Sequence, residues 1–370
     1  MAATLARYAR QTILPGVGAE GQARLAEASV LVVGAGGLGS PALTYLAAAG
    51  VGRIEVVEFD RVDESNLHRQ ILYTTGDVGR PKAEAAAERL RALNPHVDVV
   101  THAERFGAHN ALRLLKNADL VLDGTDTFAT RYLVNDAAVL SGTPNVYASV
   151  SQFDGQASVF GAPGGPCYRC LFPEPPPPGL IPNCAEGGVL GVLPGLLGTI
   201  QATEALKVLL GIGEPLVGRL LLVDALSMTT RTLRVDRDPT CPVCGDAPSV
   251  TSLSQHPTPM SAPTVPEITV RDLKDRMDRG DAPFVLDVRE PDEYEGANID
   301  GALIPLGQLP ERLGEIEGHK DQDVVVHCRS GGRSAKAVEY LRGQGFSKAV
   351  NLKGGIHAWS DEIDPSLPKV

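Results

Sequence analysis

The stretch Val30-Leu-Val-Val-Gly-Ala-Gly-Gly-Leu-Gly39 decides how the first part of this chain folds. Four branched apolar residues in a row predict a strand buried on both faces, with an apolar helix after the glycines. Gly34, Gly36 and Gly39 have the G-x-G-x-x-G spacing. This spacing allows a tight turn, close approach of the backbone to an anion, and close helix packing. The stretch therefore predicts a βαβ unit that binds the phosphates of a nucleotide.

A second strand, expected at 53–58, ends in Glu58. A carboxylate about 20 residues after such a glycine loop accepts hydrogen bonds from the ribose hydroxyls of a bound nucleotide. The motif alone does not distinguish a nucleotide that carries a hydride from one that is itself the reagent. An oxidoreductase that uses NAD and an enzyme that consumes ATP are therefore both open at this point.

Strands and helices alternate along the rest of the first 150 residues. The expected helices lie at 83–93, 108–116 and 128–140, and the expected strands at 97–101, 118–122 and 144–149. This alternation predicts an α/β fold with a doubly wound, Rossmann-like and mostly parallel sheet. Its ligand belongs at the carboxyl ends of the strands. Further strands at 156–160 and 219–223 and a helix at 189–210 are expected to complete this region.

Composition divides the chain into two domains. The stretch 249–266 is rich in proline, serine and threonine, which predicts a linker. We therefore expect a first domain at 1–248 and a second, small α/β domain at 267–370. The second domain should contain helices at 270–279 and 334–343 and strands at 284–288 and 323–327.

Charge and composition argue against several classes of function. The formal net charge of -11 does not favour a nucleic-acid partner. The first residues carry arginines and no apolar core, so no signal peptide is expected. The uncharged stretch 187–203 is interrupted by Pro194 and several glycines, which favours a buried helix over a membrane span. We expect a cytoplasmic protein.

Four of the six cysteines form two C-x-x-C pairs, Cys167 with Cys170 and Cys241 with Cys244. In a chain without an export signal, such pairs favour a metal site over disulfides. Four thiolates in a tetrahedral array are typical of structural zinc, so these cysteines are the expected Zn²⁺ ligands. The alternatives are four unrelated buried cysteines, or a redox pair, which would open a helix directly after a strand.

The other two cysteines lie in different surroundings. Cys328 begins the loop Cys328-Arg-Ser-Gly-Gly-Arg333 between a buried strand and a helix. Inward-turned backbone N–H groups and nearby arginines would stabilise a thiolate, so Cys328 is the expected nucleophile rather than an inert buried cysteine. Cys184 lies in a proline-bounded stretch, 173–188, that is expected to be a mobile crossover loop. Its residues alone indicate only a free thiol.

Several charged residues can face the glycine loop. Arg69 lies in the connection that leaves the second strand, and Lys82 begins the next helix. With Arg10, they are candidates for binding the charges of a triphosphate, although each could be an ordinary surface cation. Asp126 follows a buried strand, where a magnesium ligand is expected; the alternative is a cap on the helix that starts at Phe128.

Two parts of the chain resemble known families. Residues 7–245 resemble the adenylyltransferases that activate ubiquitin-like sulfur-carrier proteins, relatives of the ubiquitin-activating enzymes. The matching motifs are Arg7-Tyr-Ala-Arg-Gln11, Gly34-Ala-Gly-Gly-Leu-Gly39, Ser65-Asn-Leu-His-Arg-Gln70, Arg80-Pro-Lys82, Asp123-Gly-Thr-Asp126 and both cysteine pairs. Residues 268–362 resemble a rhodanese domain. The motifs there are Leu286-Asp-Val-Arg-Glu-Pro-Asp-Glu-Tyr294, Ile299-Asp-Gly-Ala302, the Cys328 loop and Gly354-Gly-Ile-His-Ala-Trp359. The fusion resembles the molybdopterin-synthase sulfurylase type.

The resemblance implies that ATP and Mg²⁺ bind in the first domain. Glu58 would hold the ribose, and the family usually has aspartate at this position. Asp126 would hold Mg²⁺. The other implied nucleotide contacts are Gly37, Ser65, Asn66, Arg69, Lys82 and Thr127, where the family often has asparagine in place of Thr127.

The resemblance also gives more specific roles to two further residues. Arg10 would reach the active site of another subunit, which implies a homodimer. Cys184 would match the loop cysteine that can take up the activated carrier. With Cys328, Arg10 and Asp126, it completes the set of expected catalytic residues.

These expectations combine into one reaction sequence. The C-terminal glycine of a ubiquitin-like carrier ending in Gly-Gly would be adenylated, and sulfur from a Cys328 persulfide would then give the carrier thiocarboxylate. Thiosulfate or a cysteine desulfurase is the expected sulfur donor. The carrier could serve molybdopterin, thiamine, cysteine or tRNA thiolation. The alternatives are an ATP-binding scaffold and an activator of a ubiquitin-like protein for conjugation.

Overall fold

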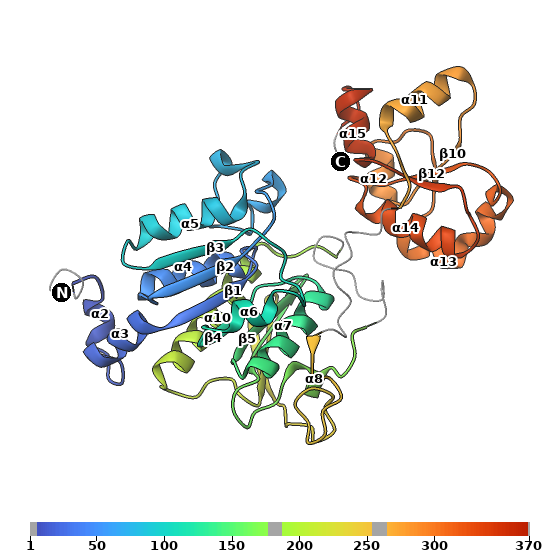
Figure 1. Ribbon diagram of the computed structural model, residues 1–370. Coiled ribbons are helices and arrows are strands. Elements are labelled where there is room, and N and C mark those ends of the chain that lie inside the picture. Colours follow the sequence, from blue (N-terminus) through green and yellow to red (C-terminus); the bar gives the residue numbers. More distant parts are fainter. Residues whose placement is uncertain (1–5, 177–186, 254–264, 369–370) are drawn as a thin grey trace. The chain divides into compact units, whose positions relative to one another are not determined.

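The computed structural model describes residues 6–176, 187–253 and 265–368 (Figure 1). Contacts between residues divide the chain into two units, 1–258 and 259–370. Residues 254–264, in the middle of the expected linker, lie outside the described residues.

The first unit is built on one mixed sheet, which within the described residues has the strand order β3-β2-β1-β4-β5-β6-β7-β8. The strands are β1 Ser29–Val33, β2 Arg53–Val57, β3 Asp98–His102, β4 Leu120–Asp123, β5 Asn145–Ser151, β6 Asp154–Phe160, β7 Arg219–Asp224 and β8 Thr229–Arg234. β1 to β5 are parallel to one another, whereas β6, β7 and β8 pair in antiparallel fashion. The predicted doubly wound, mostly parallel sheet is confirmed.

Helices cover both faces of this sheet. They are α2 Ala9–Thr12, α3 Gly18–Glu27, α4 Gly39–Ala49, α5 Lys82–Leu93, α6 Ala111–Leu115, α7 Phe128–Ser141, α8 Tyr168–Leu171 and α10 Val192–Leu210, with short 3₁₀ turns η1 Glu64–Asn66 and η2 Thr75–Asp77. One hydrophobic core joins α3, α4, α5 and α10 to one face, and a second joins α6 and α7 to the other. The unit is a three-layer α/β/α structure.

Strand β1 shows why a continuous apolar run was needed at 30–33. Val30 and Val32 belong to one core, and Leu31 and Val33 belong to the other. Successive side chains of a strand point to opposite faces, so a strand covered on both sides needs an apolar residue at every position. The pattern therefore fixes β1 in the middle of the sheet, and with it the position of the glycine loop.

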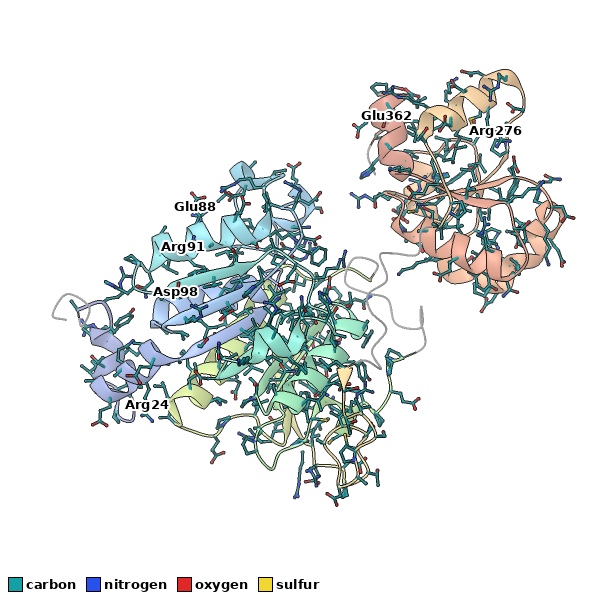
Figure 2. All side chains as sticks on the ribbon, viewed as in Figure 1. Arg24, Glu88, Arg91, Asp98, Arg276 and Glu362 are labelled. Atoms are coloured by element: carbon teal, nitrogen blue, oxygen red, sulfur yellow. The ribbon has the colours of Figure 1, made fainter. Side chains whose placement is uncertain are left out.

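Helix α5 is amphipathic through alanine rather than through large apolar residues. Ala85 and Ala86 are buried against the first core, whereas Glu88 and Arg91 lie on the outer side of the helix (Figure 2). The helix starts directly after Pro81, whose backbone precedes the first turn, and ends at Asn94. Its first residue, Lys82, is thereby placed at the start of the helix at the carboxyl edge of the sheet.

The second unit has a parallel sheet, which within the described residues has the order β11-β10-β12-β13-β9. Its elements are β9 Glu267–Ile268, α11 Val270–Arg279, β10 Phe284–Asp287, α12 Pro291–Gly296, β11 Ala302–Leu303, η4 Leu306–Gln308, α13 Leu309–Arg312, η5 Leu313–His319, β12 Val324–His327, α14 Gly332–Gly343, β13 Ala349–Leu352 and α15 Gly355–Glu362. One core contains residues of α13 and α14, and another contains residues of α11 and α15. The predicted small α/β domain is confirmed.

None of the helices in the described residues combines the length and the apolar character that a membrane span requires.

Candidate functional site

The glycine loop follows β1 and contacts the loop that follows β4. Gly34 has a φ of +92°, and a Cβ atom on it would lie 2.9 Å from the carbonyl oxygen of Gly124. A Cβ atom on Gly39 would lie 2.0 Å from the carbonyl oxygen of Gly34. Both positions therefore require glycine, one for its backbone conformation and both for the close approach. The contact places the loop that carries Asp126 beside the predicted phosphate loop.

Glu58, at the carboxyl end of β2, supports the glycine loop directly. Its Oε2 accepts the N–H of Ala35 at 2.9 Å, and its Oε1 accepts those of Phe59 and Asp60 at 2.8 and 2.9 Å. A carboxylate has about four acceptor positions, so about one is left for a ribose hydroxyl. The extra methylene of glutamate, relative to aspartate, gives the side chain a longer reach from the end of β2 to the N–H of Ala35 in the glycine loop.

The connection after β2 packs against the same loop. A Cβ atom on Gly37 would lie 3.7 Å from Cγ of Arg69 and 3.0 Å from Cβ of Pro194. The guanidinium Nη1 of Arg69 donates to the carbonyl oxygen of Ser65 at 2.9 Å. Ser65 and Asn66 form η1, so they lie in the turn that holds Arg69. Two segments, η1 and the first turn of α10, thus border the glycine loop.

Lys82 is a buried cation with one distant partner. Its side chain is 6% exposed, and its Nζ lies 3.5 Å from Oδ2 of Asp60, whose own side chain is 57% exposed. A buried ammonium group is costly unless it is closely paired with an anion. Because Asp60 follows Glu58 by two residues, Lys82 lies near the nucleotide loop with its charge only partly compensated. This is the arrangement expected of a phosphate-binding lysine.

The loop after β4 presents one buried and one exposed carboxylate. Asp123 is fully buried; its Oδ1 accepts the N–H and O–H of Thr125 at 3.0 and 2.6 Å, and burial raises its pKa. Asp126 is exposed. Thr127, and not Asp126, caps α7, since its Oγ1 accepts the N–H of Thr130 at 3.3 Å. The helix-cap alternative for Asp126 is therefore wrong.

Arg10 lies far from these residues within one chain. Tyr8, two residues earlier, packs against Gly50 at the end of α4, and its hydroxyl accepts from Nδ2 of Asn94 at the end of α5. Both helices begin at the carboxyl edge of the sheet and run back to its amino edge. Arg10 in α2 is thus at the end of the sheet where β1 begins (Figure 1), opposite to the glycine loop. One chain does not bring Arg10 into its own nucleotide site.

Phe59 and Arg105 are candidate site residues that the motifs did not indicate. Cζ of Arg105 lies 3.7 Å from the centroid of the Phe59 ring, a cation–π contact between the ends of β2 and β3. The Phe59 side chain is half exposed and follows Glu58 directly. An aromatic residue directly after the carboxylate that was predicted to bind ribose was the signal available in the sequence. Such a flat surface suits a nucleotide base.

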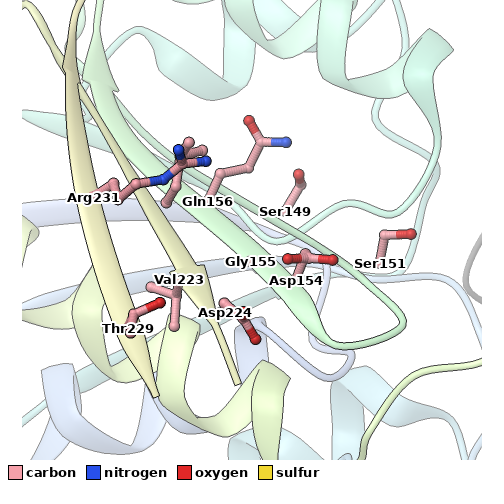
Figure 3. Close-up of a pocket in the computed structure, with 10 residues that line it drawn as sticks. Ser149, Ser151, Asp154, Gly155, Gln156, Val223, Asp224, Thr229 and Arg231 are labelled. Carbon is pink, nitrogen blue, oxygen red and sulfur yellow. The ribbon is translucent and has the colours of Figure 1, made fainter. Parts of the chain in front are cut away.

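A pocket of about 160 Å³, lined by both polar and apolar residues, lies farther along the same edge of the sheet (Figure 3). It is lined by residues of β5, β6, β7 and β8, namely Ser149, Ser151, Asp154, Gly155, Gln156, Leu222, Val223, Asp224, Thr229 and Arg231. β5 is parallel to β4 and β6 is antiparallel to it, so the end of β5 and the start of β6 share the edge that carries the nucleotide loops. The pocket therefore continues the row of loops that starts at Gly34.

The four paired cysteines come together from two distant parts of the chain. The ligand atoms of Cys167, Cys170, Cys241 and Cys244 all lie within 4.8 Å of one another. A hydrogen bond with Cys170 and burial raise the pKa of Cys167, and burial raises the pKa of Cys244 to about 12, whereas the hydrogen bond with Cys167 lowers the pKa of Cys170 to about 5, so ionising all four thiols would be costly without a cation. A divalent metal would supply that charge, and an all-sulfur set matches zinc. The donor set thus fits the predicted metal.

Loss of this metal should destabilise the first unit. Cys244→Ser removes one of four ligands, and we expect a fall in the melting temperature of about 10 °C, corresponding to about 3 kcal/mol in a domain of this size. The measurement is differential scanning calorimetry of the full chain together with its zinc content. Cys328→Ser is the matched control, because it changes a cysteine outside the cluster. An unchanged melting temperature in a metal-depleted Cys244→Ser protein would rule out a structural metal here.

In the second unit, Cys328 is cradled at the end of β12. Its Sγ accepts the N–H of Gly331 at 3.2 Å, and the hydroxyl of Ser334 lies 3.3 Å from the same sulfur. Gly331 has a φ of +99°, which an L-residue adopts only with strain. The loop leads straight into α14. This geometry is the inward-turned nest predicted from the glycines.

The two arginines of the Cys328 loop have different partners. Both Nη atoms of Arg333 donate to the carboxylate of Glu293 at 2.6 Å. Burial opposes the ionisation of Glu293, but its hydrogen bonds with Arg333 and with the N–H of Glu290 prevail and hold its pKa below the ordinary value. Arg329 is exposed, and its Nε donates to Nε2 of His357 at 3.2 Å. Arg329 therefore provides an exposed cation next to Cys328 in the sequence.

His327, the residue before Cys328, is fully buried. Burial lowers its pKa to about 4, although Asp287, 3.5 Å away, works in the opposite direction. In the unfolded chain its pKa is about 6.5, so the unfolded state binds the proton more readily between these values. The stability of the second unit is therefore complete above about pH 6.5 and falls as the pH drops toward 4.

We expect the second unit to lose about 3 kcal/mol across this interval because of His327 alone. His327→Asn should flatten the dependence above pH 5; below that, protonation of Glu293 also contributes. Urea unfolding followed by tryptophan fluorescence measures the effect, since Trp359 is the only tryptophan in the sequence and lies in this unit. An equal slope in wild type and His327→Asn would show that His327 is not the source.

The structure thus gathers most of the predicted nucleotide residues at one edge of the first sheet. These are Gly37, Glu58, Ser65, Asn66, Arg69, Lys82, Asp126 and Thr127. Arg10 lies at the opposite edge, and Cys328 lies in the other unit. Cys184, within 177–186, is outside the described residues.

Comparison with known proteins gives a match for each unit. The model of the ThiF family matches residues 8–243, and that of the Rhodanese-like domain matches residues 269–362. A protein of Mycobacterium tuberculosis named "Probable adenylyltransferase/sulfurtransferase MoeZ" is 47% identical over 98% of this chain and 94% of its own length. The "Sulfur carrier protein adenylyltransferase" of Thermus thermophilus is 63% identical over 66% of this chain and 92% of its own length.

Solved structures show a similar fold for the first unit. A crystal structure of Escherichia coli MccB covers 65% of this chain and 75% of its own, with a TM-score of 0.58 and 22% sequence identity. At this identity the likeness concerns the fold alone.

Proposed function

The chain belongs to the ThiF family and carries a rhodanese-like domain in the same polypeptide, and we propose that it converts the C-terminal glycine of a ubiquitin-like sulfur carrier into a thiocarboxylate. It is an adenylyltransferase and a sulfurtransferase, as its relatives are named. The observation that carries the proposal is the presence of both sites in one chain: a phosphate loop bordered by a buried lysine, and a cysteine cradled by backbone N–H.

Adenylation comes first because a free carboxylate is a poor electrophile. The carrier carboxylate attacks the α-phosphate of ATP and displaces pyrophosphate, and the acyl-adenylate then has AMP as a leaving group. Lys82 and Arg69 stabilise the charge that develops on the phosphates. Asp126 would hold Mg²⁺, which supplies further positive charge when bound. Phe59, stacked with Arg105, provides a flat face for the adenine.

The tail of the carrier needs a path to the α-phosphate. The pocket at the ends of β5 to β8 lies on the same edge of the sheet as the nucleotide loops, and it offers Ser149, Gln156 and Arg231 as hydrogen-bond donors. These groups suit an extended peptide backbone. We assign this pocket to the C-terminal residues of the carrier.

A second copy of the chain completes the nucleotide site. Arg10 is exposed at the amino edge of the sheet, opposite to its own glycine loop, which supports a role in the site of another chain. A homodimer in which each α2 lies over the nucleotide loop of the partner would supply this charge. This arrangement follows the implied role of Arg10.

Sulfur transfer uses Cys328. Its thiolate attacks the outer sulfur of thiosulfate, or of a desulfurase persulfide, and the sulfite or cysteine thiolate leaves. The terminal sulfur of the resulting persulfide attacks the acyl-adenylate, AMP leaves, and the carrier is joined to Cys328 as an acyl disulfide. A second thiol, which we assign to Cys184, attacks Sγ of Cys328 and releases the thiocarboxylate. The disulfide that remains is reduced by an external thiol.

Intact-mass spectrometry tests this proposal. A small carrier ending in Gly-Gly is incubated with the full chain, Mg-ATP and thiosulfate, and AMP is measured in parallel. We expect a mass gain equal to the replacement of one oxygen by sulfur. We propose a carrier of molybdopterin synthesis in the cytoplasm, and carriers for thiamine, cysteine and tRNA thiolation are tested beside it. Absence of both AMP and the mass gain with every carrier would overturn the proposal in favour of a scaffold.

A further inference from the structure

A series of side chains in contact with one another leads from the edge of the second unit's sheet to the sulfur of Cys328. Oγ of Ser334 lies 3.3 Å from Sγ of Cys328 and 2.7 Å from Oδ1 of Asn351. Nδ2 of Asn351 donates to Oε1 of Glu267 at 3.1 Å. Cys328, Ser334 and Asn351 are 1%, 0% and 2% exposed, so water does not replace these contacts. Glu267, on the edge strand β9, is exposed.

The register between strands β9 and β13 fixes the outer part of this series of side chains. Asn351 in β13 is the direct parallel partner of Glu267 in β9, and the N–H of Asn351 donates to the carbonyl oxygen of Pro266 at 2.8 Å. The two side chains are therefore held together by the sheet itself. An ionised carboxylate is an acceptor only, so it requires the NH₂ of Asn351 to face it. Glu267 thus decides which way the Asn351 amide points.

The orientation of the amide then determines the Ser334 proton. With NH₂ toward Glu267, Asn351 presents Oδ1 to Ser334, and two oxygens at 2.7 Å need a proton between them. Ser334 has one hydroxyl proton, so it cannot donate to Oδ1 of Asn351 and to Sγ of Cys328 at once. The shorter contact, to Asn351, takes it. Ser334 then turns a lone pair toward the sulfur.

We propose that Glu267 and Asn351 are positioning residues that hold the Ser334 hydroxyl away from donation to Cys328 and thereby restrain thiolate formation. With its own proton directed to Asn351, Ser334 offers the sulfur, 3.3 Å away, an oxygen acceptor in place of a donor. When the thiol loses its proton, Ser334 must either keep a lone pair against the anion or rotate and leave Oδ1 of Asn351 without its donor. The sulfur is therefore less nucleophilic than its loop alone would make it.

Other charged residues lie near Cys328, and none of them is changed in the variants used for the test. Arg329 and Arg333 belong to its own loop, Glu293 of α12 is paired with Arg333, and His357 of α15 is bonded to Arg329. Three buried charged or titratable groups are linked to one another in the same unit: Asp287 at the end of β10, Arg289 two residues later, and His327 at the end of β12. None of them contacts the Ser334 hydroxyl in the interactions described for this unit.

The test is a double-mutant cycle read by thiolate absorbance. For each protein, absorbance at about 240 nm is titrated between about pH 5 and pH 10, and the curve of the matching Cys328→Ser protein is subtracted. Asn351→Leu has similar volume but no acceptor, so Ser334 can donate to the sulfur. We expect its thiolate midpoint to fall by about one pH unit, a tenfold gain in thiolate. Ser334→Ala should move the midpoint little, and Ser334→Ala/Asn351→Leu should match Ser334→Ala.

Each outcome of this mutant cycle either supports or overturns the inference. An unchanged midpoint in Asn351→Leu, or a fall that survives in the double variant, would overturn the inference, because a structural effect of Asn351 does not require Ser334. Glu267→Gln at the exposed edge provides a second, milder variant should Asn351→Leu not fold. It should lower the midpoint in the same direction, again only when Ser334 is present.

The functional significance of this inference rests on the proposed role of Cys328, but the experiment that tests it does not. The titration uses neither donor nor carrier. If the mutant cycle gave the expected midpoints but the protein transferred no sulfur, the roles of Glu267 and Asn351 would stand and the proposed function would be overturned. If sulfur were transferred but the midpoints did not shift as expected, the proposed function would stand and this inference would be overturned.

Discussion

Lys82→Ala is expected to lower kcat/KM for carrier adenylation by about 10²–10³-fold, the loss typical when one preorganised donor to a developing charge is removed. The Lys82 side chain is 6% exposed, and its ion-pair partner among the described residues is the exposed Asp60 carboxylate, 3.5 Å away. The burial of this positive charge is therefore consistent with a site in which a bound phosphate supplies the compensating negative charge. Pyrophosphate release in the presence of a carrier measures the effect. Sulfur transfer from thiosulfate to cyanide at Cys328 should be unaffected, because that reaction uses the second unit alone.

Arg89→Ala is the matched control for this variant. Arg89 is an exposed cation on the same helix, seven positions along α5, so its loss changes the net charge equally. We expect its adenylation rate to stay within about twofold of wild type. A Lys82→Ala enzyme with undiminished pyrophosphate release would remove Lys82 from the phosphate site and leave Arg69 as the cation nearest the glycine loop.

The sheet of the first unit was predictable because its central strands are buried on both faces. β1 and β4 need an apolar residue at almost every position, and such runs are visible in the sequence. β8 was not predicted, since all its residues are exposed and it has no apolar side to produce a pattern. In the second unit, β9 and β11 have two residues each, which is too short for any periodicity.

The site was predictable where one motif carries one function, and less so where contacts join distant residues. The glycine spacing indicates a phosphate loop by itself. By contrast, the links from Glu58 to Ala35 and from Ser334 through Asn351 to Glu267 depend on strand register. Register is set by packing across the whole sheet, so no local stretch contains it. The partner of a polar residue is thus harder to predict than its presence.

Arg10 illustrates the same limit in another way. Its motif implied a role in the nucleotide site, but only the direction of α4 and α5 shows that the role cannot be filled within one chain. A helix that starts at the ligand edge of a parallel sheet ends at the opposite edge. The residue can therefore fill that role only in a site that two chains build together, as we propose.

Cys328→Ser is expected to abolish thiocarboxylate formation, a loss of more than about 10³-fold, while AMP formation with the carrier stays within about twofold. A serine hydroxyl cannot carry a sulfane sulfur, since the product would lack the S–S bond from which sulfur is transferred. The change leaves the N–H of Gly331 with an oxygen acceptor, so the loop should fold. Intact-mass spectrometry of the carrier and chromatography of AMP measure the two steps in one reaction mixture.

Two matched variants separate the explanations for such a loss. Arg329→Ala keeps the nucleophile but removes an exposed cation at the rim, so it should raise KM for thiosulfate and reduce the maximal rate far less. Cys184→Ala should still form the acyl disulfide on Cys328 but release the thiocarboxylate slowly unless an external thiol is added. If Cys328→Ser still gave thiocarboxylate from thiosulfate at the wild-type rate, the sulfur would reach the adenylate without this loop. The rhodanese-like domain would then have to act on some other acceptor.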